Sequence, residues 1–255
     1  MGPDPDHAPA HTAELLEAIR RRRIVDLSHP LHDAMPIFPG RNVLPFERRQ
    51  TARLAEHGVS AGRISMGEHQ GTHLDAPCHF IDGGLTADQI PAHHLVAEAV
   101  VIDVEVAAAA DPDHLLSTPQ VLAWEAAHGP IPAGSYVLVR SGWGRRWSDP
   151  ARFVGADETG VLHYPAISAD AAHALVDRGV LGVGVETLSV DNALPSPVRS
   201  PAHKVLHGAG RYVIENLARL DELPARGIVL ILGALPIRDG TAGPARILAF
   251  VDDPS

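Results

Sequence analysis

Residues 69–80 read His69-Gln70-Gly71-Thr72-His73-Leu74-Asp75-Ala76-Pro77-Cys78-His79-Phe80, so three histidines and an aspartate fall within eleven residues. Imidazole nitrogen and carboxylate oxygen are the ligands that zinc and neighbouring first-row metals accept most readily. The glycine and the proline disfavour a helix, and an extended chain places His73 and Asp75 on one face. The stretch therefore predicts a strand that runs into a shaped loop and presents His69, His73 and Asp75 together to a metal ion.

Chance clustering is the alternative interpretation, because the chain has 16 histidines among its 255 residues. Cys78 lies inside the stretch and resembles a further ligand or a nucleophile, although a small, partly buried filler is the favoured interpretation. Four candidate ligands this close together, with glycine and proline shaping the loop between them, favour a metal site.

The composition describes an ordinary globular protein, with 45% hydrophobic and 20% charged residues, and the length is compatible with one large domain. A net charge of −10 makes nucleic acid or an anionic membrane an unfavourable partner. A single cysteine excludes an internal disulfide framework and fits a cytoplasmic setting. Residues 1–12 lack the apolar core of a signal peptide, and we expect them to be a disordered tail before a domain that spans residues 13–255.

Strands and helices alternate along the chain, which predicts a single mixed α/β domain. We expect helices at residues 13–22, 118–129 and 168–178, and strands at residues 24–27, 99–104, 135–140, 180–185, 227–232 and 245–251. Ser168 is expected to cap the third of these helices, and Gly179 to end it.

Residues 58–62 match the G-x-S-x-G elbow of serine hydrolases and make Ser60 a candidate nucleophile. That motif carries chemistry only when a strand precedes it and a helix follows. Here the upstream residues are polar and the downstream residues alternate as in a strand. The context argues against a nucleophile elbow.

The run H-x-G-T-H-x-D-x-P-x-H-F at residues 69–80 resembles the signature of the bacterial cyclase-family metal hydrolases, which include kynurenine formamidase and isatin hydrolase. The resemblance extends from about Ile24 to Phe250. It implies the swivelling β/β/α fold with a mixed sheet, and a homodimer or homotetramer as the assembly.

The same resemblance implies a metal centre with two ions per chain, Zn²⁺ being favoured and Mn²⁺ the alternative. His69, His73 and Asp75 would hold one ion, and Asp75 would bridge to a second ion held by His203 and Glu215. His203 is expected in a loop and Glu215 at the end of a strand. The isatin-hydrolase branch is similar but has Gln at the place of Glu215 and a single metal.

Two residues depart from the family pattern. His207 stands where the family usually has an apolar residue, and it is either an extra ligand at i, i+4 from His203 or a bystander, which is the favoured interpretation. Residues 184–191 resemble a block beside the family's active site, but Glu186 stands where the family often has Asp. No role is carried over to it.

A bound metal lowers the pKa of water to give hydroxide and polarises a carbonyl, and His79 suits general acid/base work. The leading functional prediction is an arylformamidase-like amide hydrolase that converts N-formylkynurenine to kynurenine and formate. Its alternative is a cyclic amide or lactone hydrolase, or a polyketide-type cyclase, of the same family. A serine hydrolase using Ser60 and a non-catalytic metal-binding protein are the rivals.

The substrate pocket is the least determined part of the prediction. Phe38, Phe80 and Trp143 are candidate apolar walls, each about equally expected in the core. An insertion around residues 147–163 is expected to reshape the pocket relative to a compact kynurenine formamidase.

Overall fold

A closed mixed β-barrel forms the centre of the computed structural model, which describes residues 8–40, 44–192 and 199–252. Within these residues the ring closes because its shortest strand, β4, pairs with both β10 and β12. Strand β1 (Arg23–Asp26) pairs antiparallel with β12 outside the ring. The seven strands of the ring are β4 (His73–Asp75), β5 (Val96–Asp103), β7 (Tyr136–Arg140), β9 (Gly182–Val185), β10 (Tyr212–Glu215), β11 (Ile228–Ala234) and β12 (Ala242–Val251).

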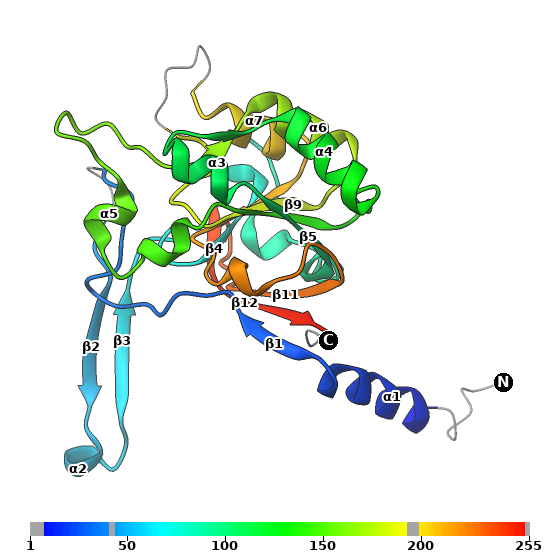
Figure 1. Cartoon of the computed structure of the whole chain (residues 1–255). Helices are drawn as coiled ribbons and strands as arrows, with labels where there is room; N and C mark the ends of the chain where they lie inside the picture. Colours follow the sequence, from blue (N-terminus) through cyan, green and yellow to red (C-terminus); the bar gives the residue numbers. More distant parts are fainter. Residues whose placement is uncertain (1–7, 41–43, 193–198, 253–255) are drawn as a thin grey trace.

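Four neighbouring strands, β5, β7, β9 and β10, run parallel, and helices connect them. The connections contain α3 (Glu105–Ala110), α4 (Thr118–His128), α5 (Pro150–Val154), α6 (Ala169–Asp177) and α7 (Pro201–Gly208), with the short parallel pair β6 (Leu115–Leu116) and β8 (Ala166–Ile167). Helices α3, α4, α6 and α7 lie together on one side of the barrel (Figure 1). Short 3₁₀ turns complete the chain: η1 (Pro77–His79), η2 (Ala87–Gln89), η3 (Ala92–Leu95), η4 (Trp143–Arg146) and η5 (Leu220–Glu222).

Two apolar clusters occupy the two faces of the strands. One cluster joins residues from around the ring, such as Leu74, Leu138 and Ile214, and the other joins the opposite face of β5, β7, β9 and β10 to helices α4, α6 and α7. Strand β9 presents Gly184 to the first cluster. A Cβ at this position would lie only 2.7 Å from the side chain of Leu217 and 2.8 Å from that of Leu138, so any larger residue would require these leucines to shift. Burial on both faces explains why these strands read as apolar runs in the sequence.

Two segments extend away from the barrel (Figure 1). One is helix α1 (Ala8–Arg20), and the other is the hairpin of β2 (Glu47–Ala52) and β3 (Ala61–Ser65) with α2 (Leu54–His57) at its tip. Helix α1 begins at Ala8, whereas the sequence predicted a start at residue 13. Residues 8–12, which were expected to belong to a disordered tail, are therefore helical. The first seven residues of that expected tail lie outside the described residues.

The expected single α/β domain is confirmed, and the helices predicted from caps are found within one or two residues of their expected bounds. Helix α4 begins after a capping box between Ser117 and Gln120, and Ser168 Oγ accepts from the N–H of Ala171 at the start of α6. The swivelling β/β/α arrangement stays a prediction, since the observed architecture is a closed barrel. Closure depends on which distant strands pair, and no local pattern in the sequence encodes that.

Candidate metal and catalytic site

The first part of the site lies on strand β4, where side chains alternate between two faces. Leu74 enters the apolar cluster of the barrel, so His73 and Asp75 on either side of it point to the opposite face. The antiparallel register places Glu215 of β10 directly across from His73. His73 Nε2 then lies 3.2 Å from Asp75 Oδ1 and 3.4 Å from Glu215 Oε2, in a fully buried setting.

His69 joins this group from the turn before β4. The turn passes through Gly71, whose φ of +65° is a left-handed conformation that favours glycine. The turn brings His69 Nδ1 to 2.8 Å from Asp75 Oδ1. The predicted trio of His69, His73 and Asp75 therefore converges, with ligand atoms within 4.8 Å of one another.

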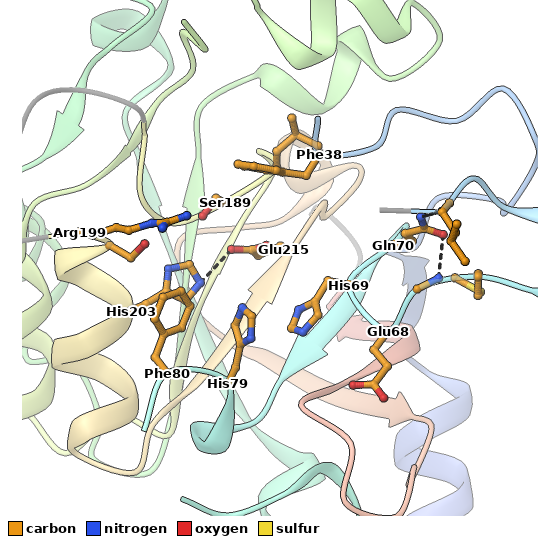
Figure 2. Close-up of a pocket in the computed structure, with 15 residues that line it drawn as sticks. Phe38, Glu68, His69, Gln70, His79, Phe80, Ser189, Arg199, His203 and Glu215 are labelled. Atoms are coloured by element: carbon orange, nitrogen blue, oxygen red, sulfur yellow. Dashed lines mark hydrogen bonds and ion pairs between the residues drawn. The ribbon is translucent and has the colours of Figure 1, made fainter. Parts of the chain in front are cut away.

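His203 reaches the same carboxylates from helix α7. Its Nε2 lies 3.5 Å from Asp75 Oδ2 and 3.3 Å from Glu215 Oε1. The expectation that His203 sits in a loop was wrong, since Pro201 opens a helix as a proline at a first helical position commonly does. Glu215 ends strand β10 as predicted. Figure 2 shows His203 and Glu215 in contact beside His79 and His69.

Each of these three histidines is held by a hydrogen bond at the ring nitrogen that faces away from Asp75. His73 Nδ1 donates to the carbonyl of Gly71 at 2.9 Å, and His203 Nδ1 lies 2.7 Å from Asp191 Oδ2. Such partners fix the ring orientation and the tautomer of a metal-binding histidine. The nitrogens that face the carboxylates are therefore left as lone-pair donors.

His69 is oriented by a longer chain of hydrogen bonds. Thr241 Oγ1 donates its one proton to Glu68 Oε2 at 2.8 Å, so it accepts from His69 Nε2 at 2.9 Å. That arrangement leaves Nδ1 of His69 free to act as the ligand atom. Sequence reasoning missed Glu68 and Thr241. The position of Glu68 beside the first histidine was the only signal, because Thr241 lies 172 residues along the chain.

The charges at the centre require cations. Burial opposes ionisation, but the surrounding histidines hold the pKa of Asp75 well below its usual range and lower that of Glu215 to about 2. In the same way, burial opposes protonation of His73, yet Asp75 and Glu215 raise its pKa to about 10. Two buried carboxylates are thus ionised, and only protons or metal ions can balance them.

Unpartnered atoms test whether the residues fit a metal. Among the described residues, both carboxylate oxygens of Asp75, Nε2 of His73 and Nε2 of His207 are buried without a hydrogen-bond partner. Unsatisfied buried polar atoms are uncommon in folded proteins, and here they converge as histidine and carboxylate ligands. The donor set suits Zn²⁺ or Mn²⁺, and it fits a bound dication.

His207 was expected to be a bystander. It lies one helical turn after His203 and is buried, and its ligand atom lies within 4.8 Å of those of Asp75 and His203. Burial lowers the pKa of its imidazole, which keeps the ring neutral near neutral pH. The structure therefore brings it into the cluster.

His79 stands beside the carboxylates without being paired to one of them in the described chain. The η1 turn that follows Ala76 carries it, and its ring centroid lies 3.9 Å from that of His69. Burial lowers the pKa of His79 to about 4, so the imidazole is neutral at pH 7 and able to accept a proton. The neighbouring Cys78 is half-buried, and burial raises the pKa of its thiol, which disfavours a thiolate nucleophile.

A cavity of about 590 Å³ opens onto this cluster. Phe38 and Phe80, the two phenylalanines among the predicted walls, both line it, and Phe38 lies across the hollow from His79 in Figure 2. Its described lining consists of Phe38, Leu44, Met66, Gly67, Glu68, His69, Gln70, His79, Phe80, Leu188, Ser189, Arg199, Ser200, His203 and Glu215. The mixture of apolar walls and a few convergent polar groups is typical of a small-molecule site.

Trp143 is placed elsewhere, in a third apolar cluster with Phe153 and Trp147. Its Nε1 donates to the carbonyl of Phe153 at 2.8 Å, and the guanidinium of Arg146 lies 3.6 Å from its ring centroid. The side chain is only 2% exposed and is not among the residues that line the cavity. The geometry favours its alternative role as a core residue.

Two further candidates lie away from the cluster. Ser60 is exposed, with helix α2 before it and strand β3 after it, which is the reverse of a nucleophile elbow. Glu186 is buried, and its Oε2 accepts from the N–H and Oγ–H of Ser141 and the N–H of Gly142. These bonds hold the turn after β7, so Glu186 supports the fold beside the site.

Comparison with known proteins gives consistent matches. The Cyclase family model matches residues 25–192. Isatin hydrolase of Roseibium aggregatum is 42% identical over 193 residues, which cover 73% of each chain. Kynurenine formamidase of Paracidovorax citrulli is 30% identical over 240 residues, covering 92% of this chain and 98% of that protein. A crystal structure of an isatin hydrolase bound to the product analogue thioisatinate superposes with a TM-score of 0.89 at 32% identity, covering 98% of this chain and 100% of the other.

In the part of the chain that the structure describes, no helix is both long enough and apolar enough to cross a membrane.

Proposed function

Because this chain belongs to the Cyclase family and is a hydrolase of that family, we propose that it is a metal-dependent enzyme that opens a cyclic amide of the isatin type. The proposal rests chiefly on one observation, the buried ligand atoms of Asp75 and His73 that have no hydrogen-bond partner. They lie beside His69, His203 and Glu215, which line a partly aromatic cavity. Greater identity to isatin hydrolase than to kynurenine formamidase favours a ring amide over a formamide.

We propose two dications per chain, of the Zn²⁺ or Mn²⁺ class. The two oxygens of Asp75 support a bridging role, because Oδ1 faces His69 and His73 while Oδ2 faces His203. Glu215 likewise directs one oxygen to His73 and the other to His203. A bound dication lowers the pKa of water and polarises a substrate carbonyl, which supplies the electrophilic part of the chemistry.

The chain itself supplies the proton transfers. His79 lines the cavity with its imidazole neutral, so it accepts a proton as water adds to the amide carbonyl carbon. As the carbon–nitrogen bond breaks, His79 returns that proton to the leaving nitrogen, and the ring opens to a carboxylate and an amine. Phe38 and Phe80 confine the flat ring, and Arg199 offers a guanidinium to the new carboxylate.

A kynurenine-type formamide is the second candidate substrate, and one residue favours it. Glu215 matches the formamidase pattern rather than the Gln that the resemblance gives for the isatin branch. A full carboxylate at this place supports a second dication, which is the arrangement that the resemblance implies for formamidases.

The test is hydrolysis of isatin and of N-formylkynurenine by the purified protein, with elemental analysis, before and after chelation. We expect chelator-sensitive opening of isatin with a higher kcat/KM than for the formamide. The reverse preference would move the assignment to a formamidase, and no turnover of either substrate by metal-loaded protein would overturn the proposal. Ser60→Ala is the control, because a metal-free serine hydrolase would lose its activity in that variant while ours would keep it.

Assembly into a homodimer or homotetramer is also part of the proposal. The projecting hairpin of β2 and β3 exposes apolar side chains, including Leu54, Val59 and Ile64. Light scattering after size-exclusion chromatography measures the mass, and a monomer at micromolar concentration would exclude the assembly.

A further inference from the structure

His207 has a buried nitrogen that the fold leaves without a partner. The residue is 2% exposed, and Nε2 has no hydrogen-bond partner among the described residues. Its other nitrogen, Nδ1, lies 3.0 Å from the carbonyl of Arg211. A carbonyl only accepts, so Nδ1 carries the hydrogen and Nε2 presents a lone pair.

The imidazole of His207 lies close to other electron-rich groups. The ligand atoms of Asp75, His203 and His207 all lie within 4.8 Å of one another, and both oxygens of Asp75 are buried without a hydrogen-bond partner. Spacing of four residues on helix α7 puts the two histidines on the same face. Converging lone pairs and negative charge in a buried site are unfavourable unless a cation or proton donors lie between them.

Phe80 holds both imidazole rings in place. Its ring centroid lies 4.4 Å from that of His203 and 5.9 Å from that of His207, with interplanar angles of 29° and 16°. Figure 2 shows Phe80 against His203 on the cavity side. The aromatic ring limits rotation of the two imidazoles, and this pre-orientation is typical of a ligand set.

We propose that Nε2 of His207 is a ligand of the second metal ion, together with Asp75 and His203. The inference rests on the proposed two-metal site and adds to it a residue with no counterpart among the ligands that the resemblance implies. A second imidazole also sets the metal preference of that position. Imidazole suits Zn²⁺, whereas carboxylate and water suit Mn²⁺, so the second position favours Zn²⁺.

The test is titration of the metal-free protein with Zn²⁺ in competition with a chromophoric chelator. The variant is His207→Asn, because its amide keeps a donor for the carbonyl of Arg211 but has no atom at the place of Nε2. We expect two equivalents to bind the unaltered protein and the weaker of the two to bind at least about tenfold less tightly in the variant. His94→Asn is the matched control, since His94 Nδ1 bonds to Tyr212 Oη outside the cluster.

The outcomes separate this inference from the proposed function. If His207→Asn binds two equivalents of Zn²⁺ with unchanged affinity, the inference is overturned, and a water molecule is the partner of His207 instead. The proposed two-metal hydrolase would not be affected by that result. A single equivalent in the unaltered protein would overturn the two-metal site and this inference together, while isatin opening would still test the hydrolase.

Two further readouts do not depend on turnover. In Co²⁺-substituted protein, loss of an imidazole ligand changes the visible absorption of the second equivalent, and an identical spectrum in His207→Asn would also overturn the inference. Thermal melting of the metal-free variant checks folding. If His207→Asn does not fold, His207→Leu, which is similar in size to Asn and has no ligand atom, replaces it in the same titration.

Discussion

Asp191 Oδ2 lies 2.7 Å from Nδ1 of His203, and the same carboxylate accepts from the backbone N–H groups of Ala202 and His203 at 2.8 and 3.0 Å. The Asp191 side chain therefore accepts hydrogen bonds from the backbone N–H groups in the first turn of α7. It also orients His203, the proposed metal ligand in that turn. Negative charge at a helix N-terminus is favourable. The position of the ligand is thus tied to the start of the helix.

Asp191→Asn is expected to weaken metal binding without unfolding the protein. The one amide oxygen still accepts from the N–H of Ala202, but the second acceptor oxygen and the charge that favour the Nδ1–H form of His203 are lost. Changes of this kind cost about 10- to 100-fold in metal affinity. Chelator competition measures that affinity, and a melting curve of the metal-free variant serves as the control. Unchanged affinity would show that Asp191 only caps the helix.

His79→Ala is expected to retain its metal and lose turnover by about 100- to 10,000-fold, the usual worth of a general acid/base. The side chain lines the cavity, and its neutral imidazole is available for proton transfer. Elemental analysis measures the retained metal, and steady-state kinetics on the same preparation measures the loss of turnover. Loss of metal in the variant would identify His79 as a ligand instead.

Phe38→Ala and Trp143→Ala are expected to fail in different ways. Phe38 is 43% exposed and lines the cavity, so its removal should lower kcat/KM at least about tenfold with little change in stability. Trp143 is buried and donates to Phe153, so its removal should cost about 3–5 kcal/mol of unfolding free energy. Steady-state kinetics measures kcat/KM of both variants, and urea denaturation measures their free energies of unfolding. A raised KM in a stable Trp143→Ala protein would contradict its assignment to the core.

Removal of the metal is expected to lower the melting temperature by about 5–10 °C for each ion that is present at about 100 times its Kd. Without cations, the ionised Asp75 and Glu215 remain buried close together and repel each other. Differential scanning fluorimetry with and without chelator measures the shift, and re-addition of Zn²⁺ should restore it. An unchanged melting temperature would argue against a buried metal centre.

The Asp113–His163 pair is expected to stabilise the fold in a pH-dependent way. Hydrogen bonds to Asp113 and Asp157 raise the pKa of His163, with Nδ1 2.7 Å from Asp113 Oδ2. A raised folded-state pKa means that the stabilisation is fully present below about pH 6.5 and is lost as the pH rises through the folded value. The urea midpoint of Asp113→Asn should therefore lie below that of the unaltered protein at pH 6, with the gap closing towards pH 9. A gap that widens with pH would contradict this.

Several elements were predictable because their signals are local. Proline and serine at helix starts located α4 and α6, and apolar runs located β7 and β11. The chain between these signals was less predictable. His203 was expected in a loop, although Pro201 at the first helical position is a local start signal. The helix that begins there buries Ala202 and Leu206. For Trp143 the sequence left a pocket wall and a core position equally open, since an aromatic residue is common in both.

The sequence by itself determined that His73 and Asp75 share one face, because alternation along a strand is a property of the local backbone. It also determined the chemistry of the donors, since residue type sets which atoms bind metal. Only the tertiary structure decided that Glu215 faces His73, that Thr241 orients His69 and that His207 joins the cluster. These relationships depend on strand register and on the packing of α7. Both are set by the apolar clusters of the whole domain, which bring residues more than 100 positions apart into contact.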